Sequence, residues 1–237
     1  MLARHDLVWL SAAGWQRAIA AAQPDQRSAM ERWSLADWPL IVRRQDGNAQ
    51  ADSISLGLAL PPAADSGIKV KIALNVPRAE VSRHSSPMSL AALLANPASV
   101  PETWRSALTS LHTQALQNDT PLFVYGSLAL QALTGLAYVT SQSDIDLLSY
   151  PASQTDLASL LAVLEQAGAE LPLDGEIVFP SMQAVAWKEW RQIMQDAPAM
   201  RILVKDRQSV RLMYPADLLT TLKLDTKQVQ TEAQCLQ

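Results

Sequence analysis

The fold of this chain can be predicted from residues 121–149, which read PLFVYGSLALQALTGLAYVTSQSDIDLLS. The stretch opens with a short apolar run, and Gly126-Ser127 then interrupt it. Leu128 to Thr134 have the composition of a buried helix, and Asp144 to Leu148 have that of another strand. This order of strand, turn, helix and strand predicts a mixed α/β domain with polar groups at the strand ends.

Asp144 and Asp146 are the first candidate functional residues. Side chains alternate along a strand, so both carboxylates lie on one face while Ile145 and Leu147 lie on the other. Neighbouring carboxylates repel one another unless a cation binds between them, and oxygen ligands of this kind suit Mg²⁺. Because solvated turns often carry the same spacing, the pair predicts a metal site only together with its surroundings.

Gly126 and Ser127 form the second candidate feature, at the junction between a strand and a helix. A glycine there allows the backbone to approach a phosphate closely. The amide groups of the helix start and the serine hydroxyl can then bind the anion. The alternative is an ordinary strand-to-helix turn with a serine cap. We therefore treat Gly126 and Ser127 as candidate phosphate-binding residues.

A third acid is expected on a later strand, which we predict from Leu173 to Phe179. Asp174 and Glu176 share one face of this strand, and either could bind the metal or accept the proton of an acceptor hydroxyl. An Asp-Gly sequence also favours a plain turn. We predict Asp174 as the third metal ligand, with Glu176 as the alternative. Lys205, at the end of an apolar strand, is a further candidate for phosphate binding, although most lysines are simply solvated.

The first 80 residues show a different pattern, in which apolar and polar residues alternate. Ile54–Leu60 and Lys69–Val76 predict half-buried strands, and the apolar run Leu40–Arg44 predicts another. We therefore expect a small module with an antiparallel sheet, followed by a domain with a mixed sheet flanked by helices. The predicted parts are an N-terminal module, a connector containing a short helix, the mixed-sheet domain and a tail, at residues 1–80, 81–100, 101–225 and 226–237.

Composition narrows the class of protein. The chain has 237 residues, of which 49% are hydrophobic, and a formal net charge of −4. These values predict a folded core and argue against a nucleic-acid partner. The single cysteine, Cys235, cannot form an internal disulfide, so we expect a cytoplasmic location. Polar residues interrupt the uncharged run from Thr120 to Ser143, so we expect no membrane span.

The order of Gly-Ser, Asp-x-Asp and a later acid resembles the polymerase-β-like nucleotidyltransferase superfamily. The run from Tyr125 to Tyr138, followed by Ser143 to Leu148, is similar to one family in particular. These are the malonate decarboxylase holo-[acyl-carrier-protein] synthases, or phosphoribosyl-dephospho-CoA transferases. The tail from Thr226 onward matches no part of the family pattern. Other similar stretches are spread over the chain, at Arg4–Trp9, Pro39–Arg44, Leu173–Val178 and Ala184–Trp187.

The resemblance implies a specific reaction and makes residues 101–225 a nucleotidyltransferase domain. Members of the family transfer the phosphoribosyl-dephospho-CoA group from triphosphoribosyl-dephospho-CoA to a serine of the apo acyl carrier subunit of malonate decarboxylase, with release of pyrophosphate. The implied roles are Mg²⁺ ligands at Asp144 and Asp146, pyrophosphate contacts at Gly126 and Ser127, and a third catalytic acid at Asp174, with Glu176 as the alternative. Two other interpretations stay open: a nucleotidyltransferase of the same fold with another acceptor, and a non-catalytic nucleotide-binding module.

Overall fold

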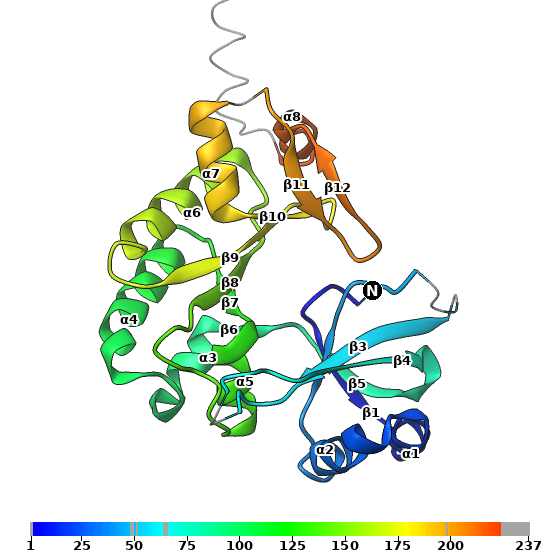
Figure 1. The fold of residues 1–237 in the computed structure, drawn as a ribbon. Coiled ribbons are helices and arrows are strands. Elements are labelled where there is room, and N and C mark those ends of the chain that lie inside the picture. Colours follow the sequence, from blue (N-terminus) through cyan, green and yellow to red (C-terminus); the bar gives the residue numbers. More distant parts are fainter. Residues whose placement is uncertain (1, 48–49, 51, 64–65, 198, 224–237) are drawn as a thin grey trace, which may run out of the picture. The chain divides into compact units, whose positions relative to one another are not determined.

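A computed structural model describes residues 2–47, 50, 52–63, 66–197 and 199–223 (Figure 1). The chain forms two compact units, each built around one sheet. The N-terminal unit contains Met1–Pro87, Ala129–Thr140 and Asp206–Ser209. The second unit contains Met88–Leu128, Ser141–Lys205 and, among the described residues, 210–223. Mixed α/β structure with two sheets is the fold class that the sequence predicts.

The N-terminal unit contains an antiparallel sheet of five strands in the order β4-β3-β2-β1-β5. This is the antiparallel module expected from the alternating sequence pattern. Its strands are β1 (Leu7–Leu10), β2 (Leu40–Val42), β3 (Ser53–Ala59), β4 (Lys71–Pro77) and β5 (Val81–Ser85). Its helices are α1 (Ala12–Ala21), α2 (Pro24–Leu35) and the 3₁₀ turn η1 (Arg78–Glu80).

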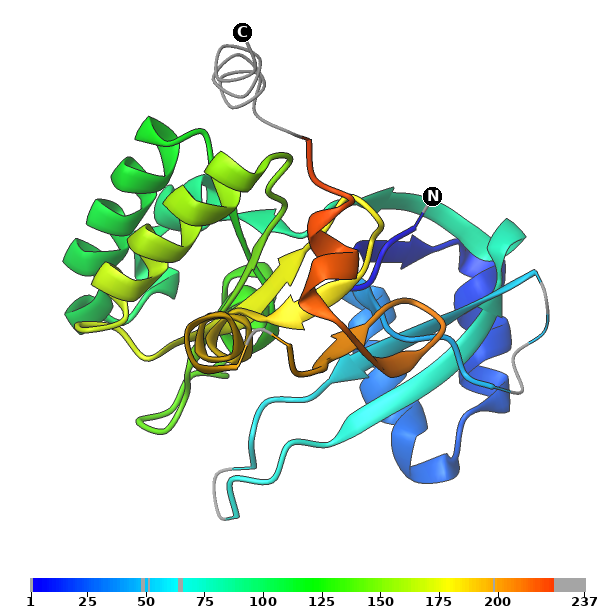
Figure 2. The same cartoon turned by 90° about the horizontal axis from the view of Figure 1, so that it is seen from above.

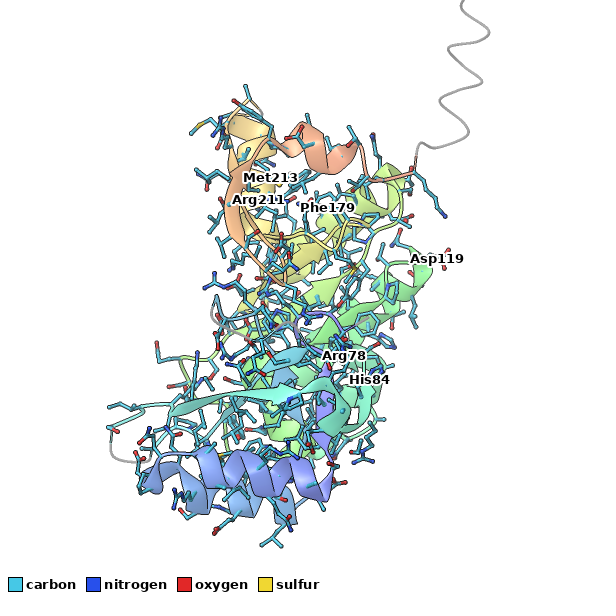
Figure 3. All side chains as sticks on the ribbon, turned by 90° about the vertical axis from the view of Figure 1, so that its right-hand side faces the viewer. Arg78, His84, Asp119, Phe179, Arg211 and Met213 are labelled. Carbon is cyan, nitrogen blue, oxygen red and sulfur yellow. The ribbon has the colours of Figure 1, made fainter. Side chains whose placement is uncertain are left out.

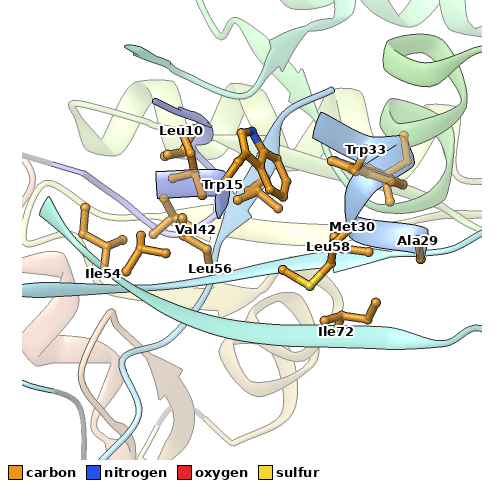
Figure 4. Close-up of a cluster of buried hydrophobic side chains, with 14 of the residues drawn as sticks. Leu10, Trp15, Ala29, Met30, Trp33, Val42, Ile54, Leu56, Leu58 and Ile72 are labelled. Atoms are coloured by element: carbon orange, nitrogen blue, oxygen red, sulfur yellow. The ribbon is translucent and has the colours of Figure 1, made fainter. Parts of the chain in front are cut away.

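The core of this unit includes side chains of the sheet and of helices α1 and α2. Figure 4 shows Met30 and Trp33 of α2 close to the side chains of β3, including Leu56 and Leu58. All four side chains are buried. Pro24 begins α2. Proline suits a first helical position because its missing N–H would have no partner there.

The second unit contains a sheet of seven strands in the order β12-β11-β10-β9-β8-β7-β6. Only β8 and β9 pair in parallel, and the other neighbours are antiparallel. The strands are β6 (Met88–Ser89), β7 (Leu122–Val124), β8 (Ile145–Ser149), β9 (Leu173–Val178), β10 (Ala184–Ala186), β11 (Ile202–Lys205) and β12 (Val210–Met213). The helices are α3 (Leu90–Leu94), η2 (Pro97–Ser99), α4 (Glu102–Gln117), α6 (Gln154–Ala167), α7 (Trp187–Asp196) and α8 (Pro215–Leu219). Helix α5 (Gly126–Thr134) begins in this unit, and its residues from Ala129 onward belong to the N-terminal unit.

Helix α6 makes the parallel pairing of β8 and β9 possible, because parallel neighbours need a crossover between them. It begins with a capping box formed by Ser153 and Asp156, and Gly168 follows its last turn. Leu157, Leu160 and Leu164 are buried along it. Figure 2 shows α4 and α6 side by side. The crossover thereby fixes β9 beside β8, which carries the Asp-x-Asp pair.

The segment predicted as a connector contributes to both sheets. Within residues 81–100, β5 pairs with β1 and β6 pairs with β7, and α3 is the short helix that the sequence predicts. The predicted tail, residues 226–237, lies outside the described residues. Among the helices of the described residues, none is both long and apolar enough to cross a membrane.

Candidate active site

Three aspartates meet where two interior strands of the mixed sheet, β8 and β9, begin. Asp146 on β8 stands directly beside Asp174 on the parallel strand β9. Asp144 comes immediately before β8, two residues from Asp146 and therefore on the same face. One carboxylate oxygen from each of the three residues lies within 4.8 Å of the other two. The structure thus brings Asp144, Asp146 and Asp174 together, as the sequence predicts.

The acids occupy the face of the sheet that is opposite α6 and α7. Leu173, next to Asp174, is buried and borders a hollow lined by residues of α6 and α7. Further along β9, Ile177 is buried on that same side, where Phe179 contacts Trp190 of α7 at 5.0 Å between ring centroids. Alternation along the strand therefore directs Asp174 and Glu176 to the other face.

Gly126 makes room for one of the three carboxylates. Its φ is +68°, a backbone conformation that side-chain-bearing residues rarely adopt. A Cβ at this position would overlap Oδ2 of Asp146 and lie 2.9 Å from its Cγ. The amide of Tyr125 donates a 3.0 Å hydrogen bond to the carbonyl of Asp146, which ties the turn to β8. The glycine is needed here for Asp146 itself, a requirement that the sequence pattern alone did not reveal.

Gly175 has a similar role on the neighbouring strand. Its φ is +139°, and a Cβ there would overlap the carbonyl oxygen of Leu147 and lie 2.7 Å from its amide nitrogen. The absence of a side chain therefore allows β9 to approach β8 closely. That approach keeps Asp174 beside Asp146.

Glu176 and Lys205 form an ion pair on the acid-bearing face. Nζ of Lys205 donates to Oε1 of Glu176 at 3.0 Å. The glutamate side chain is only 6% exposed, whereas the lysine side chain is 35% exposed. Glu176 is thus paired with Lys205 and is not part of the three-aspartate cluster. Of the two acids left open by the sequence, Asp174 is the one that faces Asp144 and Asp146.

This ion pair could not be predicted from spacing, because its partners are 29 residues apart and lie on different strands. The sequence gives only a weak indication of the pair, because each of the two residues is a charged residue within an apolar strand. Ser127 follows Gly126 at the start of α5 and is partly buried. The sites predicted around Gly126, Ser127 and the acids therefore belong to one region of the mixed sheet.

Comparison with known proteins identifies the family of this chain. Residues 3–87 match the family described as Phosphoribosyl-dephospho-CoA transferase MdcG N-terminal domain. Residues 89–216 match the description Phosphoribosyl-dephospho-CoA transferase MdcG C-terminal domain. The chain belongs to this family. The three aspartates, Gly126 and the Glu176–Lys205 pair all lie within the residues of this chain that match the C-terminal domain.

Individual MdcG relatives are similar over most of their length. A phosphoribosyl-dephospho-CoA transferase of Xanthomonas euvesicatoria pv. vesicatoria is 36% identical over 222 residues, which cover 92% of this chain and 97% of the relative. The transferase of Bradyrhizobium diazoefficiens is 38% identical over 214 residues, with 89% of each chain covered. No solved structure gives a significant match to the chain. The resemblance inferred from the sequence is thus confirmed at the level of the family.

Proposed function

We propose that this protein transfers the phosphoribosyl-dephospho-CoA group from triphosphoribosyl-dephospho-CoA to a serine of the apo acyl carrier subunit of malonate decarboxylase, and that pyrophosphate is released. One observation carries the proposal: three aspartates converge beside a glycine–serine helix start in a chain that belongs to the MdcG family. Membership of the family supports a transferase, and the site supports transfer of a phosphate-linked group.

The donor set fits Mg²⁺. Three carboxylates within 4.8 Å of one another supply oxygen ligands alone, which is the chemistry that hard divalent cations prefer. Among the described residues, neither Asp144 nor Asp174 forms an ion pair with a lysine or arginine. A cation from outside the chain would therefore relieve their mutual repulsion. When bound, Mg²⁺ supplies charge neutralisation at the reacting phosphate oxygens.

In the proposed reaction, the oxygen of the acceptor serine attacks the α-phosphorus of the donor. A new P–O bond forms to the serine, and the bond from that phosphorus to the bridging oxygen of pyrophosphate breaks. Amides at the start of α5 and the hydroxyl of Ser127 would bind the departing pyrophosphate. Asp174 would accept the serine proton, because its carboxylate faces the reacting centre. Lys205, oriented by Glu176, would neutralise charge on the transferred phosphate.

Intact mass measurement of the apo carrier subunit tests the proposal directly. The wild type should add the mass of the phosphoribosyl-dephospho-CoA group in the presence of Mg²⁺, and a chelator should abolish the gain. Asp146→Asn should slow the transfer about 1000-fold, which corresponds to loss of about 4 kcal/mol of transition-state stabilisation. Asp217→Asn on α8 changes an exposed carboxylate outside the site and should leave the rate unchanged.

The same experiment separates the two other interpretations. If the folded wild type consumes the triphosphate donor with Mg²⁺ but never modifies this carrier subunit, a nucleotidyltransferase with another acceptor is favoured. If it binds the donor but transfers the phosphoribosyl-dephospho-CoA group to no acceptor and releases no pyrophosphate, a non-catalytic nucleotide-binding module is favoured. Either result would contradict the proposed reaction.

A further inference from the structure

The hairpin of β11 and β12 exposes an apolar strip. Leu203 and Leu212 are directly paired across the two strands, and both are exposed. Val210 and Tyr214 continue the strip along β12 and the residue that follows it, and they are exposed as well. We call these four residues the hairpin strip. Strand β12 forms one edge of the mixed sheet, and exposed apolar edge strands are a liability that proteins normally cover.

The hairpin strip lies on the acid-bearing face of the sheet. Lys205 pairs with Ala184 of β10 and reaches Glu176, which fixes its side chain on that face. Leu203, two residues earlier on the same strand, shares the face with Lys205. Val210 and Leu212 are the cross-strand partners of Lys205 and Leu203, so they share it too. Figure 3 marks Arg211 and Met213, which alternate with the strip along β12.

Strand order places the strip on one particular side of the three aspartates. Gly126 and Ser127 follow β7, which is the neighbour of β8 on one side. Strands β10, β11 and β12 extend from β9 on the other side. In an in-line displacement, the entering oxygen and the leaving oxygen stand on opposite sides of the phosphorus. With pyrophosphate at Gly126 and Ser127, the acceptor serine therefore enters from the side of the hairpin.

A basic residue stands at each end of the strip, and Glu176 and Glu189 place carboxylates beside it. The guanidinium of Arg201 lies 5.1 Å from the ring centroid of Tyr214, and the ammonium of Lys205 lies at the other end of β11. The carboxylate of Glu189 is also close, but it accepts a hydrogen bond from the amide of Leu203 at 3.2 Å. An apolar strip with a cation at each end is complementary to a surface that presents apolar side chains between carboxylates.

We propose that the hairpin strip is the docking surface for the acceptor protein, and that it receives an apolar segment flanked by carboxylates next to the acceptor serine. The inference rests on the proposed function for the identity of the acceptor. In this proposal, β11 and β12 position the acceptor serine so that its oxygen reaches the three aspartates from the side opposite the departing pyrophosphate.

A matched pair of leucines allows a direct test. Leu212 in the strip and Leu116 on α4 are each 57% exposed. Leu212→Asp should raise the KM for the apo acyl carrier subunit about 10-fold, because it places a carboxylate opposite those of the partner. Binding of the triphosphate donor should not change. Leu116→Asp should alter neither quantity, and circular dichroism should show both variants folded.

Photocrosslinking provides a second readout that does not depend on turnover or on a destabilising charge. Benzoylphenylalanine in place of Leu212 should crosslink the apo carrier subunit, whereas the same residue in place of Leu116 should not. Wild-type transfer with no crosslink and no change of KM at position 212 would overturn the docking proposal and leave the reaction intact. A crosslink at position 212 without any transfer by the wild type would support the docking and contradict the reaction.

A second copy of this chain is the competing occupant. Crosslinks at position 212 between two copies, with a dimer in sedimentation velocity that Leu212→Asp dissociates, would overturn the proposal in favour of a self-association surface. A monomeric wild type that crosslinks only the carrier subunit would support it.

Discussion

The two sheets of this protein hold their carboxylates in contrasting ways. In the segment between β2 and β3 of the N-terminal unit, Asp46 receives hydrogen bonds from both terminal nitrogens of Arg43 and from Nδ2 of Asn75. The chain itself supplies the positive charge, and the bonds from Arg43 hold the pKa of Asp46 below its ordinary value. In the mixed sheet, three aspartates face one another within 4.8 Å.

This difference distinguishes a structural carboxylate from a functional one. A carboxylate with its own arginine stabilises the fold and has little capacity left for a ligand. A cluster of like charges lowers stability unless a cation binds, so its presence indicates a site made for something outside the chain. Changes in the mixed sheet should therefore reduce activity, and changes around Asp46 should reduce stability.

After Asp146→Asn, the next largest loss of transfer is expected from Gly126→Ala. The new Cβ would displace the carboxylate of Asp146, and a misplacement of about 1 Å can slow a reaction about 100-fold. Gly135→Ala is the matched control, because Gly135 also has a positive φ, +71°, but no atom lies within 4 Å of its added Cβ. Both variants should lose stability in thermal unfolding, and only Gly126→Ala should lose transfer. Equal activity in the two would contradict the role given to Gly126.

A smaller effect is expected from Glu176→Gln, which removes the charge that orients Lys205 and keeps the shape of the side chain. We expect transfer to slow about 10-fold, as for other groups that orient a residue at the site. Asp174→Asn should slow it much more, because Asp174 belongs to the cluster. Similar losses in the two variants would mean that Glu176 is itself the third acid. A double-mutant cycle with Lys205→Met should show that the two residues act together.

The smallest effect is expected from Asp46→Asn. It should lower the free energy of unfolding by about 1 kcal/mol at neutral pH and leave transfer unchanged. Because the folded-state pKa of Asp46 is lowered, its stabilisation is fully present above the unfolded pKa. That stabilisation is lost as pH falls through the folded pKa, so urea titrations should show wild type and variant converging in acid. Asp52→Asn changes an exposed carboxylate 3.9 Å from Arg78 and should have no effect.

Local patterns in the sequence were enough to predict much of this structure. Side chains alternate between the two faces of a strand, which placed Asp144 and Asp146 on one face. The alternation of apolar and polar residues in β3 and β4 predicted the antiparallel sheet. The short apolar run before Gly126 predicted β7 and the helix after it. These features depend on residues that are close together in the chain.

Features that depend on distant residues could not be predicted in the same way. The pairing of Asp146 with Asp174 needs the parallel register that α6 creates. The space that Gly126 leaves for Asp146, and the contact of Lys205 with Glu176, follow only from how the strands pack.

Metal binding is the most direct test of the central claim, that the three aspartates form a divalent cation site. Electron paramagnetic resonance can count bound Mn²⁺, a stand-in for Mg²⁺, with the purified protein and triphosphoribosyl-dephospho-CoA. We predict saturable binding in the wild type and in Asp46→Asn, and binding at least about 10-fold weaker in Asp144→Asn, Asp146→Asn and Asp174→Asn. Equal Mn²⁺ affinity in all five proteins would contradict the claim.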